Sequence, residues 1–159
     1  MLEGLNKKLK NNVNNLPKII AITTFLTDVA CLYYINNYWL KTKLSSLITM
    51  SFKVQGFSSV SPSTMKQAEA VLGNSLGTMF FFFLMWHLFI YILMFFKKDW
   101  AINYVYRYVF LTIVLTLFEF VVLIKDFTPW FIFLFIITMS YGFTYLGLRE
   151  VKKNSAQSS

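Results

Sequence analysis

The sequence predicts an all-α integral membrane protein: a four-transmembrane-helix bundle with a short amphipathic outer segment between helices 1 and 2. Hydrophobic residues make up 57% of the 159 residues, aromatic residues 19% and charged residues only 14%. A soluble domain of this size could not bury that much apolar surface. The stretch from Gly77 to Phe96, GTMFFFFLMWHLFIYILMFF, contains one ionisable group, His87. Its length of about 20 residues matches the roughly 30 Å hydrocarbon thickness of a bilayer.

The first predicted span, at residues 19–40, follows a basic arm at residues 1–18. A secretory signal peptide also begins with basic residues before an apolar region. Here the apolar run continues through Cys31 to Trp39, and Asp28 stands where a lipoprotein signal needs an apolar residue. We therefore interpret this segment as a retained helix, with Tyr38 and Trp39 at the membrane interface.

The connection at residues 41–75 is predicted to lie outside the membrane, with an amphipathic helix in its first part. Polar residues recur there every four positions from Lys41 to Lys53, and leucines and isoleucines fall on the other side. Such a helix suits the membrane interface. Residues 55–61 read as a loop, after which Ser61 and Pro62 predict a helix start.

Three further spans follow and complete the bundle. Lys97 and Lys98 end the second span, Pro129 precedes the fourth, and no internal repeat is visible. The predicted order is a basic cytoplasmic arm at 1–18, spans at 19–40, 76–97, 101–125 and 129–148, an extracytoplasmic loop at 41–75, and a polar cytoplasmic tail at 149–159.

The distribution of basic residues predicts the orientation. The net charge of +8 first suggests nucleic acid as a binding partner. The positive residues, however, flank the apolar segments. This position indicates that they contact lipid headgroups and set the membrane topology, so we expect no nucleic-acid partner. With both termini in the cytoplasm the inner side carries more lysine and arginine than the outer side, as the positive-inside rule requires. The expected topology anchors are Lys97, Lys98, Arg107, Arg149, Lys152 and Lys153. We expect a location in the plasma (inner) membrane.

Asp28, His87 and Glu119 stand out among the charged or titratable residues of the predicted spans, because placing a charge in lipid is costly and needs a structural or functional explanation. Asp28 and His87 each lie about 11 residues from the outer end of their spans, or roughly 16 Å deep. We expect them to meet as an intramembrane polar pair on neighbouring antiparallel helices. Glu119 lies nearer the outer surface, so a cluster of all three is not expected. The pair has two interpretations: a structural tie between helices, or a proton or ion site.

Secondary polar residues form stripes on the predicted helices. Thr24 shares a face with Asp28, and Thr112 and Thr116 share one with Glu119. Threonine in membrane helices commonly bonds its own backbone, which is the simpler interpretation. Gly73 and Gly77 form a small-xxx-small pair that would permit close helix packing.

The sequence lacks the residues that several kinds of functional site require. A haem held by two histidines is excluded by the single histidine, and an internal disulfide or a cysteine-rich metal site by the single Cys31. No phosphate-binding glycine loop, HExxH sequence or nucleophile elbow occurs. We therefore expect no metal, no cofactor and no enzymatic activity.

Two functions remain open. The first is a non-enzymatic accessory subunit or interaction module of a membrane complex, whose partners are the lipid bilayer and a membrane protein. The alternative is a small oligomeric transporter or channel that uses Asp28 and His87 for proton linkage. Histidine suits that role because it changes charge near physiological pH.

Overall fold

The structure, a computed structural model, describes the backbone of residues 2–57, 60–123 and 128–157 and the side chains of 15–57, 60–123 and 128–153. Its elements are α1 (Leu2–Tyr34), the π-helical turn η1 (Ile35–Trp39), α2 (Leu40–Val54), α3 (Pro62–Phe95), α4 (Asp99–Leu123) and α5 (Pro129–Gln157). These described ranges contain no strand. Four helical stretches are long and apolar enough to cross a membrane. The prediction of an all-α chain with four candidate spans is thus confirmed.

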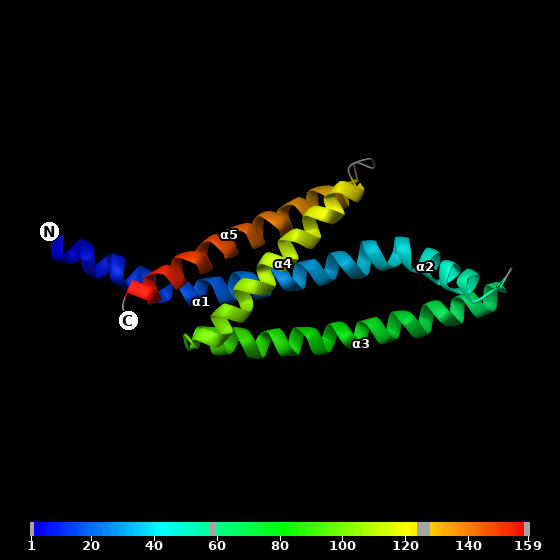
Figure 1. Cartoon of the computed structure of the whole chain (residues 1–159), viewed down its shortest axis with the longest axis horizontal. Coiled ribbons are helices and arrows are strands. Elements are labelled where there is room, and N and C mark those ends of the chain that lie inside the picture. Colours follow the sequence, from blue (N-terminus) through cyan, green and yellow to red (C-terminus); the bar gives the residue numbers. More distant parts are fainter. Residues whose placement is uncertain (1, 58–59, 124–127, 158–159) are drawn as a thin grey trace.

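The four long helices form a closed ring in which α1 and α4 lie opposite each other. Helices α3 and α5 each pack against both α1 and α4. Figure 1 shows α4 crossing the other helices obliquely, from the end of α3 towards the start of α5. Each helix therefore presents one face to a shared interior.

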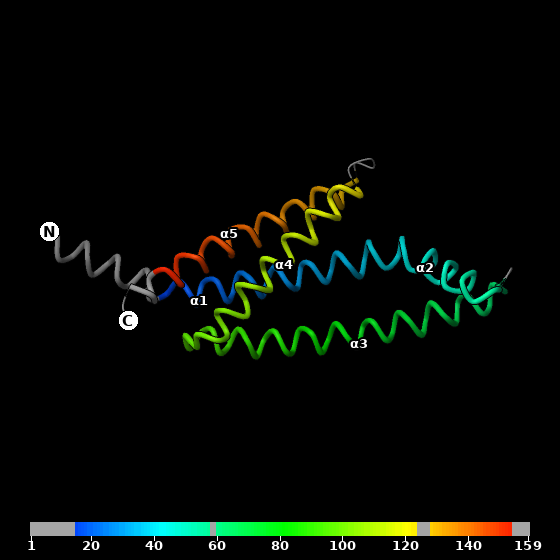
Figure 2. The backbone as a smooth tube through the Cα atoms, viewed as in Figure 1, coloured from blue at the N-terminus to red at the C-terminus, as the bar shows by residue number. Residues whose placement is uncertain are grey.

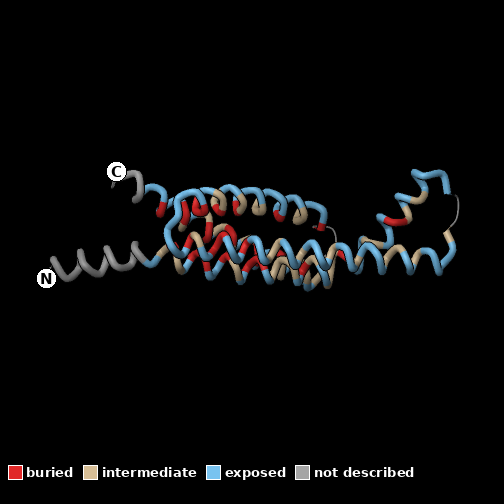
Figure 3. The backbone as a smooth tube through the Cα atoms, turned by 90° about the horizontal axis from the view of Figure 1, so that it is seen from below, coloured by how far each residue is buried: buried red, intermediate tan, exposed pale blue. Residues whose placement is uncertain are grey.

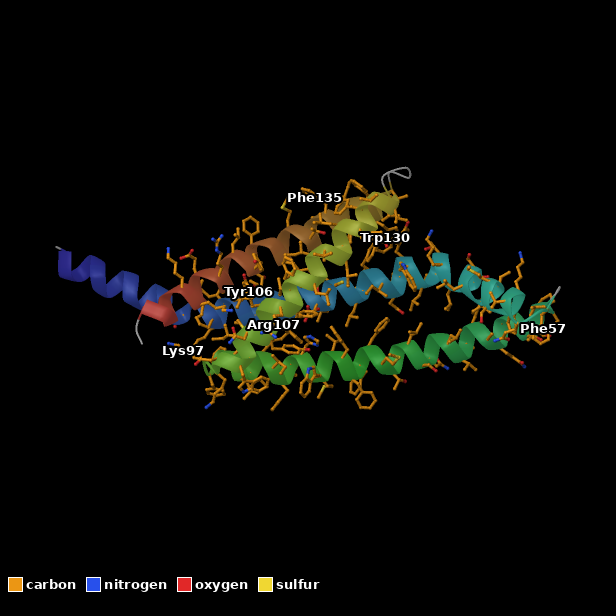
Figure 4. The ribbon with its side chains drawn as sticks, viewed as in Figure 1. Phe57, Lys97, Tyr106, Arg107, Trp130 and Phe135 are labelled. Atoms are coloured by element: carbon orange, nitrogen blue, oxygen red, sulfur yellow. The ribbon has the colours of Figure 1, made fainter. Side chains whose placement is uncertain are left out.

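The basic ends of the helices gather on one side of the molecule. Helix α1 begins and α5 ends near the α3–α4 turn, which Figure 4 marks at Lys97, whereas the α2–α3 connection with Phe57 lies at the far end. The predicted anchor residues on α3, α4 and α5 consequently lie towards the same end of the ring.

The first helix begins before the predicted span of residues 19–40, and its helical path continues past residue 40. It begins at Leu2, includes Pro17, and continues through η1 into α2, as the tube in Figure 2 follows. In the π-helical turn, the backbone N–H of Leu40 bonds the carbonyl of Ile35, five residues back. The Asn37 amide donates to the Tyr33 carbonyl at 3.1 Å, so a side chain supplies a bond within the widened turn.

Helix α2 and the first half of α3 form an antiparallel hairpin. Glycine closes the end of α2: Gly56 has φ +88°, and the backbone N–H groups of Gly56 and Phe57 bond the carbonyls of Lys53 and Phe52. This is a Schellman cap, completed by contact between the Phe52 and Phe57 rings at 5.9 Å. The sequence placed this loop correctly.

Helix α3 begins as the sequence predicts. Ser61 Oγ accepts a hydrogen bond from the Thr64 backbone N–H at 3.1 Å, and Pro62 occupies the first turn. Helix α3 then runs without interruption to Phe95, so the helix that starts at Pro62 and the second predicted span are one element. It ends in a second Schellman cap, where Lys97 adopts φ +56°.

Side-chain burial separates the ring from the hairpin. Figure 3 shows buried residues concentrated where four helices run together, and mostly exposed residues along the projecting hairpin. The interior of the ring includes polar residues, whereas large apolar side chains such as Phe82, Phe118 and Phe143 point outward with 66%, 67% and 74% exposure. An apolar exterior around a partly polar interior is the arrangement expected in lipid.

The tail from Arg149, predicted to be non-helical, continues α5 through Gln157.

Candidate functional site

Asp28 lies at the centre of the ring and receives a hydrogen bond from each of the other three helices. Its side chain is 1% exposed. Tyr91 of α3 donates to Oδ2, and Tyr108 of α4 and Tyr141 of α5 donate to Oδ1 at 2.9 and 2.7 Å. One carboxyl group therefore joins all four helices. We call Asp28 and these three tyrosines the carboxyl–tyrosine knot.

His87 lies beside the knot and is equally buried, at 1% exposure. Its Nδ1 is 2.9 Å from the Phe83 carbonyl, which can only accept, so Nδ1 carries the proton that is donated there. The imidazole packs against the rings of Phe83 and Tyr108, with centroids 3.9 and 4.5 Å away. Its Nε2 is buried and has no hydrogen-bond partner among the described residues.

Asp28 and His87 share the interior of the bundle, but they do not form the directly bonded pair that the sequence suggested. No hydrogen bond joins them within the described part of the chain. The carboxyl group is occupied by three phenols, and His87 is turned towards the backbone of its own helix. Tyr108 connects the two, because its hydroxyl bonds Asp28 and its ring packs on the imidazole.

The threonines of the predicted stripes bond the backbone of their own helices. Thr24 Oγ1 donates to the Ile20 carbonyl at 2.6 Å, Thr112 to Tyr108 at 3.0 Å and Thr116 to Ile113 at 3.0 Å. Thr24 and Thr116 are buried, whereas Thr112 is half-buried. These hydroxyls thus make their hydrogen bonds within their own helices and add no bond to the knot.

Glu119 lies apart from the knot. It is half-buried on α4 and interacts electrostatically with the Tyr34 phenol of α1, although no hydrogen bond of acceptable geometry joins them. Tyr34 also contacts the rings of Tyr38 and Trp130, with centroids 5.4 and 5.9 Å away. This aromatic group ties the start of α5 to the end of α1, where an interfacial belt is expected.

Among the described residues, no other part of the chain packs closely on Gly73 or Gly77. A Cβ atom built on either glycine would meet nothing within 4 Å. Gly77 is exposed and Gly73 half-buried. Close packing through this pair would therefore need a second chain.

The expected anchor residues lie mostly on the surface. Lys98, Arg107, Arg149, Lys152 and Lys153 are exposed. One of them, Lys152, also packs on an aromatic ring, with its Nζ 4.6 Å from the centre of the Tyr106 ring.

Surface grooves border the bundle on two sides of α1, and the one between α1 and α3 is lined in part by Tyr91 of the knot. A groove of about 550 Å³ lies between α1 and α5, and its lining includes Thr23, Ser140 and Gly147 but neither Asp28 nor His87. Thr27 and Ser140 share a hydrogen bond of 2.5 Å across the same pair of helices. Within the described residues no group of three or more histidine, cysteine or acidic side chains could hold a metal ion.

Sequence reasoning missed the three tyrosines as partners of Asp28. Tyr91 falls within the apolar stretch from Gly77 to Phe96 and was treated as part of it. A usable signal was present, because a phenol in the middle of an apolar span needs a hydrogen-bond partner.

Comparison with models of known protein families, with curated proteins and with solved structures gives no match to this chain.

Proposed function

We propose that this chain is an integral membrane protein that crosses the bilayer four times and serves as a non-enzymatic component of a membrane complex. Four helices of sufficient length and hydropathy, and an apolar exterior around a polar interior, support the membrane assignment. The clustering of anchor residues at one end supports termini in the cytoplasm and a plasma (inner) membrane location. In this placement the α2–α3 hairpin projects on the outer side.

The length of the hairpin carries the proposal. Helix α3 has 34 residues and so is about 51 Å long, well beyond the roughly 30 Å hydrocarbon core. If its apolar part from Gly77 spans the core, about 15 residues remain outside, or roughly 22 Å. Helix α2, which pairs with that part, also has 15 residues. Two matched helical segments thus extend past the bilayer as a preformed arm.

The surface of the arm is unusually apolar for a segment in water. Met50, Val54, Phe57 and Val71 are 66%, 81%, 55% and 65% exposed. Large apolar side chains exposed on an element outside the bilayer favour an interaction surface. Together with the unpacked Gly73, they support a protein partner for the arm.

The test is purification from native membranes in mild detergent, followed by identification and stoichiometry of co-purifying proteins. We expect a stoichiometric partner with the wild type. Val54→Ser combined with Val71→Ser should release it, and the control Phe118→Ala, on the lipid-facing side of α4, should retain it. A clean homo-oligomer with no partner would refute the accessory role.

The alternative function, a proton-linked transporter or channel formed by an oligomer, has one observation in its favour. The buried Nε2 of His87 has no hydrogen-bond partner among the described residues, and the imidazole packs on Tyr108, which bonds Asp28. A buried polar atom without a partner is costly and often marks a functional site. Asp28→Asn should then abolish proton-coupled flux in proteoliposomes while Thr24→Val leaves it intact. Unchanged flux with Asp28→Asn would eliminate this alternative.

A further inference from the structure

Two tyrosines and two basic residues form a cluster between α4 and α5 near the basic end of the ring. The hydroxyl of Tyr106 on α4 donates to that of Tyr145 on α5 at 2.6 Å, and the two rings stack with centroids 4.7 Å apart. Lys152 extends over the outer face of Tyr106, with its Nζ 4.6 Å from the ring centre. Arg149 lies one turn beyond Tyr145 on α5 and is exposed. Figure 4 labels Tyr106 at this junction.

The cluster holds more donors than acceptors. Tyr106 gives its hydroxyl hydrogen to Tyr145, so the hydrogen of Tyr145 must point elsewhere. No acceptor for it, and no carboxylate paired with Arg149 or Lys152, occurs within the described residues. Glu150 is next to Arg149 in sequence, but consecutive residues lie about 100° apart around a helix. The cluster therefore presents a hydroxyl donor and two positive charges without a balancing anion.

We propose that Tyr145, Arg149 and Lys152 bind a singly charged phosphate group. The three residues fall within an arc of about 60° on α5, so their donors converge on one side. Arginine offers two parallel N–H groups that fit phosphate oxygens, and lysine and tyrosine each add one donor. Tyr106 is a positioning residue, because it aligns the Tyr145 hydroxyl and holds Lys152 over its ring.

The position of the cluster favours the phosphodiester of an anionic phospholipid as the source of this group. Arg149 follows the apolar part of α5, so in the proposed membrane placement the cluster lies at the level of the headgroups. The inference rests on that placement and not on the accessory role. Arg107 provides a matched control, because it is an exposed arginine at similar depth on α4, about 100° around the helix from Tyr106.

The test measures lipid retention by the full chain in detergent, using native mass spectrometry with phosphatidylglycerol and phosphatidylcholine at equal amounts. The wild type should retain phosphatidylglycerol preferentially. Arg149→Gln and Tyr145→Phe should each weaken that retention about tenfold, the usual scale for a lost charge-assisted hydrogen bond. Arg107→Gln removes the same charge and should leave retention unchanged.

Each result has a defined meaning. Equal losses for Arg149→Gln and Arg107→Gln would overturn the site, because general charge would then explain the retention. Displacement of phosphatidylglycerol by millimolar inorganic phosphate would keep the phosphate site but assign it to the free ion. Arg149 is exposed, so its variant tests the site even if Tyr145→Phe fails to fold. A wild type that stays soluble without detergent would refute the membrane placement, whereas micellar protein without lipid preference would refute only the site.

Discussion

Replacing Asp28 with alanine should destabilise the bundle more than any loss of a single hydroxyl. The substitution removes the acceptor for Tyr91, Tyr108 and Tyr141 at once, and leaves three phenols buried between helices. Hydrogen bonds between membrane helices contribute about 0.6 kcal/mol on average and up to about 1.7. Three of them give an expected loss of about 2 to 5 kcal/mol in the free energy of unfolding.

A matched substitution separates this loss from the effect of altering a buried polar residue. Thr24 lies one turn from Asp28 on α1 and is 0% exposed, but its hydroxyl bonds only the Ile20 carbonyl of its own helix. Thr24→Val keeps the shape of the side chain and breaks no bond between helices. We therefore expect it to cost less than about 1 kcal/mol.

The assay is unfolding of the detergent-solubilised protein by increasing mole fractions of sodium dodecyl sulfate, followed by circular dichroism. A double-mutant cycle with Tyr91→Phe isolates one bond of the knot, because Asp28 is the hydrogen-bond partner of the Tyr91 hydroxyl. Tyr91→Phe should destabilise the wild type but be neutral or stabilising beside Asp28→Ala, where that hydroxyl has lost its acceptor. If Asp28→Ala costs no more than Thr24→Val, or the two effects in the cycle simply add, the knot does not hold the helices together.

Two further predictions concern helix packing and orientation. Gly147→Ala would place its Cβ 2.8 Å from Cδ1 of Ile20, so it should be neutral or destabilising, whereas Gly142→Ala meets nothing within 4 Å and should stabilise by about 0.5 to 1 kcal/mol. Ile20→Val removes the clashing atom and should restore Gly147→Ala to the behaviour of Gly142→Ala in the same unfolding assay. In a background without the native cysteine, Ser46→Cys on α2 should react with an impermeant thiol reagent on intact cells. Lys98→Cys should react only after permeabilisation, and the reverse pattern would refute the proposed orientation.

The sequence predicts the number and kind of the helices better than their ends. Spans are set by apolar length, and the Ser61 cap and the Gly56 turn are local signals that the structure reproduces. Whether neighbouring segments join into one helix is not decided by such local signals. Gly73 and Gly77 lower helix propensity by only about 1 kcal/mol each, which the pairing of α3 with α2 can offset. One continuous α3 therefore joins the helix start at Pro62 to the second predicted span.

The site was predictable in its position but not in its bonding. Exposing a polar side chain to lipid is costly, so Asp28 and His87 are expected inside the bundle, and both are buried there. The direct pair was expected because they share a depth, but depth does not give rotation about the helix axis. Counted from the basic residue that flanks each span, Asp28 and His87 each lie 10 residues deep, whereas Tyr141 lies 8 and Tyr91 6 residues deep. Depth alone therefore favours His87 over these tyrosines, and only packing decides which side chains reach the carboxyl group.

The arrangement of α1 and α3 links the two proposed functions. These helices lead into and out of the arm, and they also carry Asp28 on one side and His87 and Tyr91 on the other. A partner that shifts the outer half of α3 along α2 would transmit the shift through a continuous helix to the Tyr91–Asp28 bond. Helices α4 and α5 have no comparable extension among the described residues on that side. Such a shift would pass His87 and then reach Tyr91 on the same helix, so mutations of Tyr91 should weaken any coupling between partner binding and proton linkage.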